Sequence, residues 1–297
     1  MALFRAMESV RPPHQRLFVD PFAPYFLRAS LRNVLRLSSL PALMGLVERY
    51  VDWRLPGARS SAIARTMFID DLLLQALRDE ISQVVILGAG FDCRAYRLPR
   101  LNAGTVYEVD YPATLNKKLA CLHRALSTLP ANVRFVAMDF NHQSLPDVLE
   151  QAGLEPSKPI VFLWEGVTNY LTPEAVDSVV SHVARCSPGS RLIFTYVEAA
   201  ALDGSVFFAG AERLLRDVAD LGEPWTFGLH PRLLTEFLGK RGLCLDIDLS
   251  ANEYTSRYFG AAAQRMTGYE FYHVANARVP GQSTDTSPIW EVEECNA

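Results

Sequence analysis

The sequence predicts an α/β fold in which helices cover both faces of a largely parallel sheet. Of the 297 residues, 49% are hydrophobic and 21% are charged, which is the balance of a chain with a well-buried core rather than a disordered one. After residue 80 the pattern changes, and short β-branched runs alternate with helical stretches. Strands that alternate with helices usually form a parallel sheet, and the length suits one such domain with extra helices.

Five short apolar runs are expected to form the parallel strands. Strands buried on both faces read as nearly continuous apolar runs, as these do. The expected strands are Val84–Leu87, Val106–Val109, Val133–Val136, Ile160–Leu163 and Leu192–Val197. Helices between them are expected at Pro112–Thr128 and Pro173–Cys186.

Two further strands are expected at Leu243–Leu249 and Tyr269–Ala277. The segment between them, Ser250–Gly268, has no strong helical stripe, so we expect a hairpin-like antiparallel return. Five parallel strands followed by such a pair make the seven-stranded, Rossmann-like sheet of class I methyltransferases.

Residues 1–80 are expected to form a helical N-terminal cap on a core of residues 81–297. Apolar residues recur there at helical spacing and are expected to pack in the core. One stripe contains Leu43, Leu46, Val47 and Tyr50, and another contains Phe68, Leu72, Leu73 and Leu77.

An insertion of residues 198–231, rich in phenylalanine and tryptophan, separates strands five and six. It is either a helix pair packed on the sheet or a lid over an acceptor pocket. The second alternative follows from its position at the strand edge where ligands bind in open α/β sheets.

Composition and charge exclude several classes of function. The net charge is −4 and the basic residues are scattered, so we expect no nucleic-acid groove. The five cysteines form no CxxC pair, which favours reduced thiols in a cytoplasmic protein. We expect no signal peptide, membrane span or metal site. A homodimer through the N-terminal helices is left open.

The strongest local signal is the run Gly88-Ala89-Gly90-Phe91-Asp92 after the first strand. Glycines there let a ligand lie across the backbone. The third glycine of the dinucleotide fingerprint is absent, since Cys93 stands in its place. A carboxylate at Asp92 would repel a pyrophosphate but would tolerate a sulfonium and an ammonium, which favours S-adenosylmethionine over NAD or FAD. Asp92 is alternatively a plain helix cap.

Acidic residues end the next three strands as well. Asp110 lies 22 positions after Gly88, near the offset of about 20 expected for a ribose-binding carboxylate. Glu108 is the competing candidate for that role. Asp139 with Phe140 offers an acceptor for the adenine amine beside an apolar wall. The pair Glu165-Gly166 ends strand four and is expected to face the methionine part of the donor.

Several segments of the chain resemble a known family. They are Ala64–Asp71, the glycine motif with Asp92-Cys93-Arg94, Tyr107–Pro112, Leu163–Leu171 and Gly222–Gly228. Together they resemble the leucine carboxyl methyltransferase-like family, especially its branch of bacterial methyltransferases dependent on S-adenosylmethionine. The resemblance extends from about residue 5 to residue 278.

The resemblance implies a helical cap over the donor, with Arg65 reaching the methionine carboxylate. Without the resemblance, Arg65 would be interpreted as a surface salt-bridge partner. It also implies donor contacts at the strand ends already described. The residues expected to bind the donor are Arg65, Gly88, Ala89, Gly90, Asp92, Asp110, Tyr111, Asp139, Phe140, Glu165 and Gly166.

The acceptor side is expected to be aromatic. Tyr170 matches a position near the acceptor in carboxyl-methylating relatives, although it could instead pack after strand four. The expected acceptor contacts are Tyr170, Tyr196, Phe207 and Trp225.

No catalytic base is evident. His142, beyond strand three, and His230, in the insertion, are the two histidines that could reach the site, and neither has a partner at a spacing that would orient it. A carboxylate acceptor needs no base, whereas a phenol or alcohol usually does. The sequence therefore favours O-methylation of a carboxylate on a small molecule or peptide, as in the natural-product tailoring that the resemblance implies. An NAD-dependent oxidoreductase and a non-catalytic donor-binding protein are the alternatives.

Overall fold

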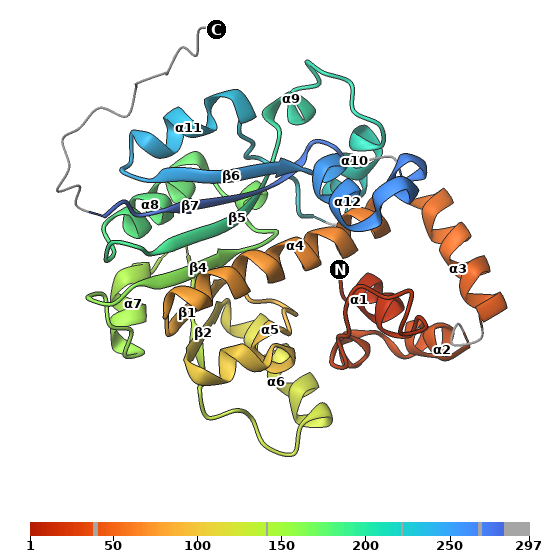
Figure 1. The fold of residues 1–297 in the computed structure, drawn as a ribbon, viewed down its shortest axis with the longest axis horizontal. Helices are drawn as coiled ribbons and strands as arrows, with labels where there is room; N and C mark the ends of the chain where they lie inside the picture. Colours follow the sequence, from red (N-terminus) through yellow and green to blue (C-terminus); the bar gives the residue numbers. More distant parts are fainter. Residues whose placement is uncertain (38–40, 141, 221, 267–268, 282–297) are drawn as a thin grey trace, which may run out of the picture.

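A computed structural model describes residues 1–37, 41–140, 142–220, 222–266 and 269–281 (Figure 1). Its centre is a seven-stranded sheet with the order β3-β2-β1-β4-β5-β7-β6. The strands are β1 (Gln83–Leu87), β2 (Thr105–Asp110), β3 (Val133–Ala137), β4 (Ile160–Trp164), β5 (Arg191–Val197), β6 (Cys244–Ser250) and β7 (Tyr272–Arg278). The α/β fold and the seven-stranded sheet predicted from the sequence are thus confirmed.

The strand order reverses beside β1. This strand pairs in parallel with β2 on one side and with β4 on the other. The chain that leaves β1 and the chain that leaves β4 therefore diverge at the same edge of the sheet. Such a switch point, at the carboxyl ends of parallel strands, is where open α/β sheets bind ligands.

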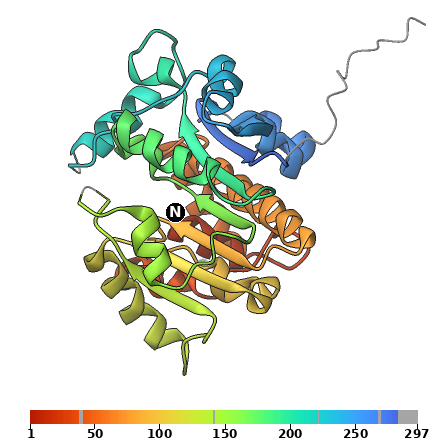
Figure 2. The same ribbon diagram turned by 90° about the vertical axis from the view of Figure 1, so that its left-hand side faces the viewer.

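Helices cover both faces of the sheet, as Figure 2 shows. One face packs against α7 (Leu145–Gln151), α8 (Pro173–Ala184) and α11 (Pro231–Gly239). The other packs against α4 (Ala58–Ala76) and α5 (Arg94–Arg97). The central strands β1, β4 and β5 are buried on both faces, which explains their nearly continuous hydrophobic runs, whereas the edge strands β3 and β6 also carry exposed residues. The helix α6 (Pro112–Ala125) joins β2 to β3.

The antiparallel edge formed by β7 and β6 is confirmed, but its connection differs from the prediction. The segment expected to lack a helix contains α12 (Ala251–Phe259) and the 3-10 helix η5 (Gly260–Arg265). A capping box starts α12. The Ser250 side chain accepts the backbone N–H of Glu253, and the Glu253 side chain accepts the backbone N–H of Ser250. Tyr254 is buried against Phe68 of α4. A short stripe with a strong cap was therefore enough to form a helix.

The N-terminal helices divide into two groups. The long helix α4 lies directly on the sheet, so it is a layer of the sandwich (Figure 1). The others pack around a small core of their own beside it. They are α1 (Ala2–Ser9), η1 (Ala23–Phe26), α2 (Ala29–Leu37) and α3 (Pro41–Arg54). No described helix combines the length and apolar character that a membrane span requires.

One of the two predicted core stripes is wrong for three of its four residues. The α4 stripe from Phe68 to Leu77 is buried, as expected. On α3, by contrast, Leu46 is 61% exposed and Tyr50 is 63% exposed. The inward face of α3 carries Met44, Val47 and Val51, so only Val47 of the predicted stripe packs inward. Helical spacing shows that residues share a face, but it does not say which face meets the core.

The insertion of residues 198–231 forms α9 (Ala199–Leu202), α10 (Ala211–Asp220) and a return stretch that ends at α11. The return stretch rejoins the sheet edge, where Leu229 N donates to Val197 O over 3.0 Å. Side chains of the insertion, including Phe208 and Trp225, pack against Phe271 and Tyr272. The insertion is therefore packed on the sheet end next to the loop after β4.

Candidate active site

The glycine loop after β1 has a backbone that suits glycine. Gly88 has φ +64° and Gly90 has φ +41°, both in the left-handed region. A Cβ on Gly88 would lie 2.4 Å from Val167 Cγ2, so the loop after β4 packs directly on the loop after β1. The helix predicted after the loop is only one turn, α5.

A cleft of about 230 Å³ lies at the switch point between these two loops. Its walls come from α1, α4 and the ends of β1 and β4. The lining residues are Met1, Ala2, Arg5, Arg65, Ile86, Leu87, Gly88, Ala89, Gly90, Phe91, Asp92, Glu165 and Gly166. Folding thus brings Arg65, the glycine loop, Asp92 and Glu165 to one place, as the sequence predicted.

Two buried arginines hold the Glu165 carboxylate. Arg65 Nε donates to Glu165 Oε1 over 2.9 Å, and Arg94 Nη1 donates to Oε2 over 2.8 Å. The Arg94 guanidinium also bonds Asp92 and, over 2.7 Å, Asp70. Arg65 is only 6% exposed, so the interpretation of a surface salt bridge is wrong. The cleft is lined by both signs of charge.

These arginines control ionisation at the cleft. Burial alone would raise the pKa of Glu165, but Arg94 and Arg65 outweigh it and lower the pKa to about 2. Burial likewise opposes the ionisation of Asp92, yet the neighbouring Arg94 lowers its pKa below the usual value. Both carboxylates are therefore anionic at neutral pH.

The Glu165→Gln variant should show how much this ion cluster stabilises the fold. Because the folded-state pKa is depressed, ionised Glu165 contributes stability above the unfolded-state pKa and loses it as the pH falls toward about 2. We expect wild type to exceed the variant by about 3 kcal/mol in free energy of unfolding at pH 7, and by about 1 kcal/mol less at about pH 3.5. Urea unfolding across this range measures both values. A difference that is constant with pH would contradict the assignment.

Asp92 holds the start of the helix α5 and also lines the cleft. Its Oδ1 accepts the backbone N–H of Arg94, the first residue of α5, over 2.7 Å. Its Oδ2 pairs with the Arg94 guanidinium inside the cleft. The carboxylate therefore holds the start of α5 and adds negative charge to the cleft wall.

Asp110 ends β2 and is joined to the glycine loop. Its Oδ2 accepts the N–H of Gly90 over 2.5 Å, and its Oδ1 accepts the N–H of Tyr111 over 2.6 Å. The competing residue, Glu108, is fully buried and bonds Lys118 Nζ at 2.9 Å. Asp110 is thus the acid on β2 that faces the loop, while Glu108 belongs to a core ion pair.

The expected adenine residues lie farther along the same edge. Asp139 and Phe140 follow β3, and Met138 N donates to Asp110 O over 2.9 Å, which places them next to the end of β2. Phe140 is partly buried against the core. Together with Asp110 and Tyr111, they are outside the lining of the 230 Å³ cleft. The structure places them beside the cleft rather than in it.

Two of the four expected acceptor residues come together. The rings of Tyr170 and Trp225 pack edge to face with their centres 6.3 Å apart, and the ring centres of Trp225 and Tyr272 are 6.1 Å apart. Tyr196, in contrast, is fully buried and donates to Asp248 Oδ2 over 2.7 Å. Its assignment as an acceptor contact is corrected to a core role. Phe207 is 88% exposed and stands away from the other rings.

Neither candidate histidine lies in the cleft. The side chain of His142 is 78% exposed and its Nδ1 lies 2.9 Å from Asp139 Oδ2. His230 is exposed at the start of α11. No histidine is found among the described residues that line the cleft.

Sequence reasoning missed four residues of this region. Arg94 and Asp70 both lie inside the resembling segments, so the resemblance carried a signal for them. Arg5 bonds the Phe91 carbonyl and donates to Asp20 over 2.8 Å, and no motif indicated it. Tyr272 begins a strand that reads as ordinary core, yet the Arg65 guanidinium lies 4.6 Å from its ring centre.

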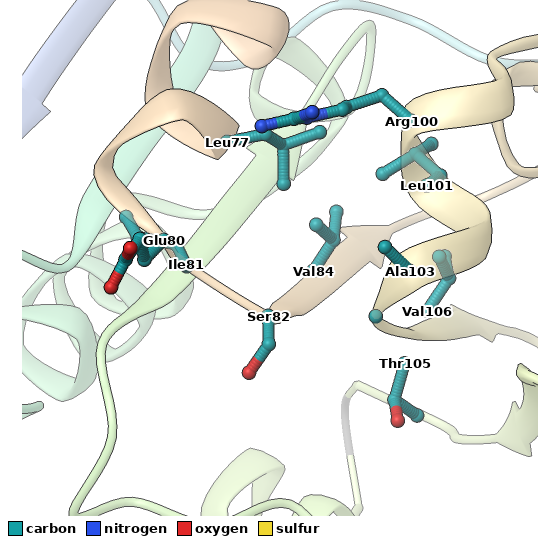
Figure 3. Close-up of a pocket in the computed structure, with 11 residues that line it drawn as sticks. Leu77, Glu80, Ile81, Ser82, Val84, Arg100, Leu101, Ala103, Thr105 and Val106 are labelled. Carbon is teal, nitrogen blue, oxygen red and sulfur yellow. The ribbon is translucent and has the colours of Figure 1, made fainter.

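Another cavity, of about 240 Å³, lies at the opposite end of β1 and β2 (Figure 3). Ser82 and Thr105 line it where these two strands begin. Open sheets of parallel strands bind their ligands at the carboxyl ends of the strands, and this cavity lies at the amino ends. The cleft at the glycine loop is therefore the better candidate for the active site.

The sheet order and the glycine loop with its strand-end acids define the class: a class I methyltransferase fold. The family model of leucine carboxyl methyltransferase matches residues 1–184. A "Putative S-adenosyl-L-methionine-dependent methyltransferase" of Mycolicibacterium vanbaalenii is 32% identical over 272 residues, which cover 88% of this chain and 86% of that protein. A protein with the same name from Mycolicibacterium gilvum is 32% identical over 270 residues, with the same coverage.

A solved structure described as a putative methyltransferase from Thermobifida fusca shares the fold. It superposes with a TM-score of 0.56 at 19% identity, covering 88% of this chain and 94% of that one. The chain therefore belongs to the leucine carboxyl methyltransferase family. Membership makes it an enzyme, a methyltransferase that depends on S-adenosyl-L-methionine.

Proposed function

We propose that the protein transfers the methyl group of S-adenosylmethionine to a carboxylate oxygen of a small-molecule or peptide acceptor, as in the tailoring of a natural product. The carrying observation is that no side chain of the described cleft residues is a free base. Asp92 and Glu165 already accept hydrogen bonds from arginines, and the pKa of Tyr272 is raised by burial, so its phenol stays protonated. An ionised carboxylate needs no base, whereas a phenol or alcohol does.

The cleft suits the methionine part of the donor. That part carries a carboxylate, an ammonium and a sulfonium, and the cleft presents buried arginines beside carboxylates. Arg65 would bind the donor carboxylate, while Asp92 and Glu165 would favour the two cations by their charge. Gly90 would let the donor lie against the loop, because an added side chain there would project beside Asp110, whereas one on Gly88 would meet Val167.

The nucleoside part would follow the edge of the sheet toward β3. Asp110 would accept the two ribose hydroxyls, since an ionised carboxylate has lone pairs beyond those used by Gly90 and Tyr111. Asp139 would accept the exocyclic amine of adenine, with Phe140 as the apolar wall. Tyr111, 52% exposed, would border the ribose.

Catalysis in this arrangement depends on position more than on proton transfer. When bound, the donor supplies an electrophilic methyl group on a sulfonium. The loops after β1 and β4 would hold the donor, and the insertion would exclude water on the acceptor side as a lid. Holding two reactants in line can lower a barrier by several kcal/mol.

The product distinguishes a carboxylate from a phenol. We expect label from methyl-labelled S-adenosylmethionine to enter aromatic and aliphatic acids, and to be released as methanol by mild alkali, because esters hydrolyse and aryl ethers do not. Label that stays bound after alkali, or that enters phenols alone, would refute carboxylate methylation while leaving the methyltransferase class intact.

Donor binding should stabilise the folded protein. S-adenosylhomocysteine at 100 times its dissociation constant would add about 2.7 kcal/mol, which corresponds to several degrees in melting temperature for a chain of this size. NAD at the same concentration should cause no shift. A shift with NAD instead would overturn the proposed donor site.

A further inference from the structure

The loop after β4 and the return stretch of the insertion are held together beside the cleft. Thr226 N donates to the backbone O of Asn169 over 2.8 Å, and Thr226 Oγ1 donates to Leu171 O over 3.2 Å. Asn169 belongs to the 3-10 helix η4 (Thr168–Tyr170), three residues after Gly166. These bonds bring residue 169 next to residue 225.

Polar atoms at this junction are buried without partners. Asn169 is 1% exposed, and neither its Nδ2 nor its Oδ1 has a hydrogen-bond partner. The Trp225 Nε1–H is also buried and unpartnered. Buried polar groups are nearly always paired, and leaving one unpaired costs about 1–3 kcal/mol. A ligand that pairs these atoms would remove that penalty.

A row of aromatic rings joins this junction to the donor cleft. Tyr170 packs on Trp225, and Trp225 packs on Tyr272. The Tyr272 hydroxyl lies 3.9 Å from the position a Cβ on Gly166 would take, and Gly166 lines the cleft. None of the residues in this row is acidic, and the Arg65 guanidinium lies over the Tyr272 ring. The row therefore offers an apolar aromatic surface, and its cleft end carries the Arg65 cation that is paired with Glu165.

We propose that Asn169 and Trp225 form the acceptor subsite, and that the acceptor is an aromatic carboxylic acid. The Asn169 Nδ2 and Trp225 Nε1 groups donate to its carboxylate, which only accepts hydrogen bonds. Asn169 Oδ1 accepts from a hydroxyl next to the carboxylate. The aromatic body lies against Trp225 and Tyr170. This subsite rests on the proposed function, since it supplies the carboxylate that is methylated.

Entry to the subsite requires a small movement. The unpartnered atoms have no exposed area, so the acceptor reaches them after a side chain turns aside. Tyr170 is 40% exposed and is the ring that can turn into solvent. Trp225 then becomes the inner wall of the subsite.

Calorimetry on the full chain saturated with S-adenosylhomocysteine tests the proposal. The probes are 3-hydroxy-2-naphthoate, 2-naphthoate and 2-naphthamide. We expect the hydroxy acid to bind about five-fold more tightly than 2-naphthoate, and the amide to bind at least ten-fold more weakly than 2-naphthoate. Asn169→Asp and Trp225→Phe should each weaken both acids at least ten-fold, because each removes N–H donors, and Asn169→Asp does so with the side-chain shape kept.

A matched control is available. Trp164, in β4, also has a buried Nε1 without a partner, but it faces the core on the α8 side. Trp164→Phe should leave the affinity for both acids within about two-fold of wild type. Melting temperature and S-adenosylhomocysteine affinity confirm that each variant is folded.

The outcomes separate the two proposals. Failure of all three probes to bind wild type, equal binding of acid and amide, or unchanged acid binding by Asn169→Asp and Trp225→Phe would overturn the acceptor subsite. None of these results contradicts the proposed donor site if S-adenosylhomocysteine still binds. If folded wild-type protein does not bind S-adenosylhomocysteine, the proposed function is overturned instead.

Discussion

Replacing Asp110 with alanine should weaken S-adenosylhomocysteine binding at least 100-fold. The carboxylate accepts the N–H groups of Gly90 and Tyr111 and is proposed to accept both ribose hydroxyls. Hydrogen bonds to a charged group contribute about 1.5–3 kcal/mol each, so losing two of them corresponds to roughly 3 kcal/mol or more. Calorimetric titration of wild type and variant measures the change directly.

The Asp110→Asn variant provides the graded control. The amide has one accepting oxygen where the carboxylate has two. We therefore expect the affinity for S-adenosylhomocysteine to fall about ten-fold rather than 100-fold. Urea unfolding of both variants separates binding from folding, because the freed Gly90 N–H also destabilises the loop. If Asp110→Ala binds as tightly as wild type, the ribose is not held at this strand end.

Replacing Gly88 with alanine should both destabilise the protein and close the donor cleft. The backbone at φ +64° penalises a side chain by about 1–2 kcal/mol. The new Cβ would also lie 2.4 Å from Val167 Cγ2, closer than any real contact, and relieving such overpacking costs about 1–3 kcal/mol more. Because Val167 follows Glu165 and Gly166, its displacement would also shift the β4 side of the cleft. Unfolding free energy and S-adenosylhomocysteine affinity are the measurements.

The Gly189→Ala variant separates the cost of the left-handed backbone from the cost of the contact with Val167. Gly189 has φ +85° but no atom within 4 Å of an added Cβ, so its substitution should cost only the backbone term of about 1–2 kcal/mol. Adding Val167→Ala to Gly88→Ala should restore part of the stability and affinity. Equal destabilisation at positions 88 and 189 would show that the contact with Val167 has no energetic consequence.

Much of the fold was predictable because its signals are local. β4 is apolar at every position and β1 at every position after Gln83, and both strands are fully buried, so pattern and burial agree. The helix α12 was missed because its buried stripe is short, although the Ser250–Glu253 capping box was legible in the sequence. On α3, spacing identified a common face for Leu46 and Tyr50 but could not show that this face points to solvent.

The site residues that could be predicted are those that lie at the ends of strands. A strand that ends at Asp110 or Glu165 puts that residue at the carboxyl edge, whatever the rest of the chain does. Tyr196 shows the limit of the same logic. It also lies near a strand end, but the antiparallel neighbour β7 and the Asp248 carboxylate on β6 enclose it. Its role therefore depended on strands that follow it by more than 45 positions.

The sequence by itself determined the sheet, the glycine loop and the acids that surround it, because short-range periodicity and turn chemistry encode them. Only the tertiary structure decided which charges pair. Arg65 meets Glu165 across 100 positions, and Arg94 meets Asp70 across 24. It also decided that the insertion meets the loop after β4, where Thr226 N and Phe227 N both donate to Asn169 O. Such contacts depend on how separate elements pack, and no local pattern in the chain specifies them.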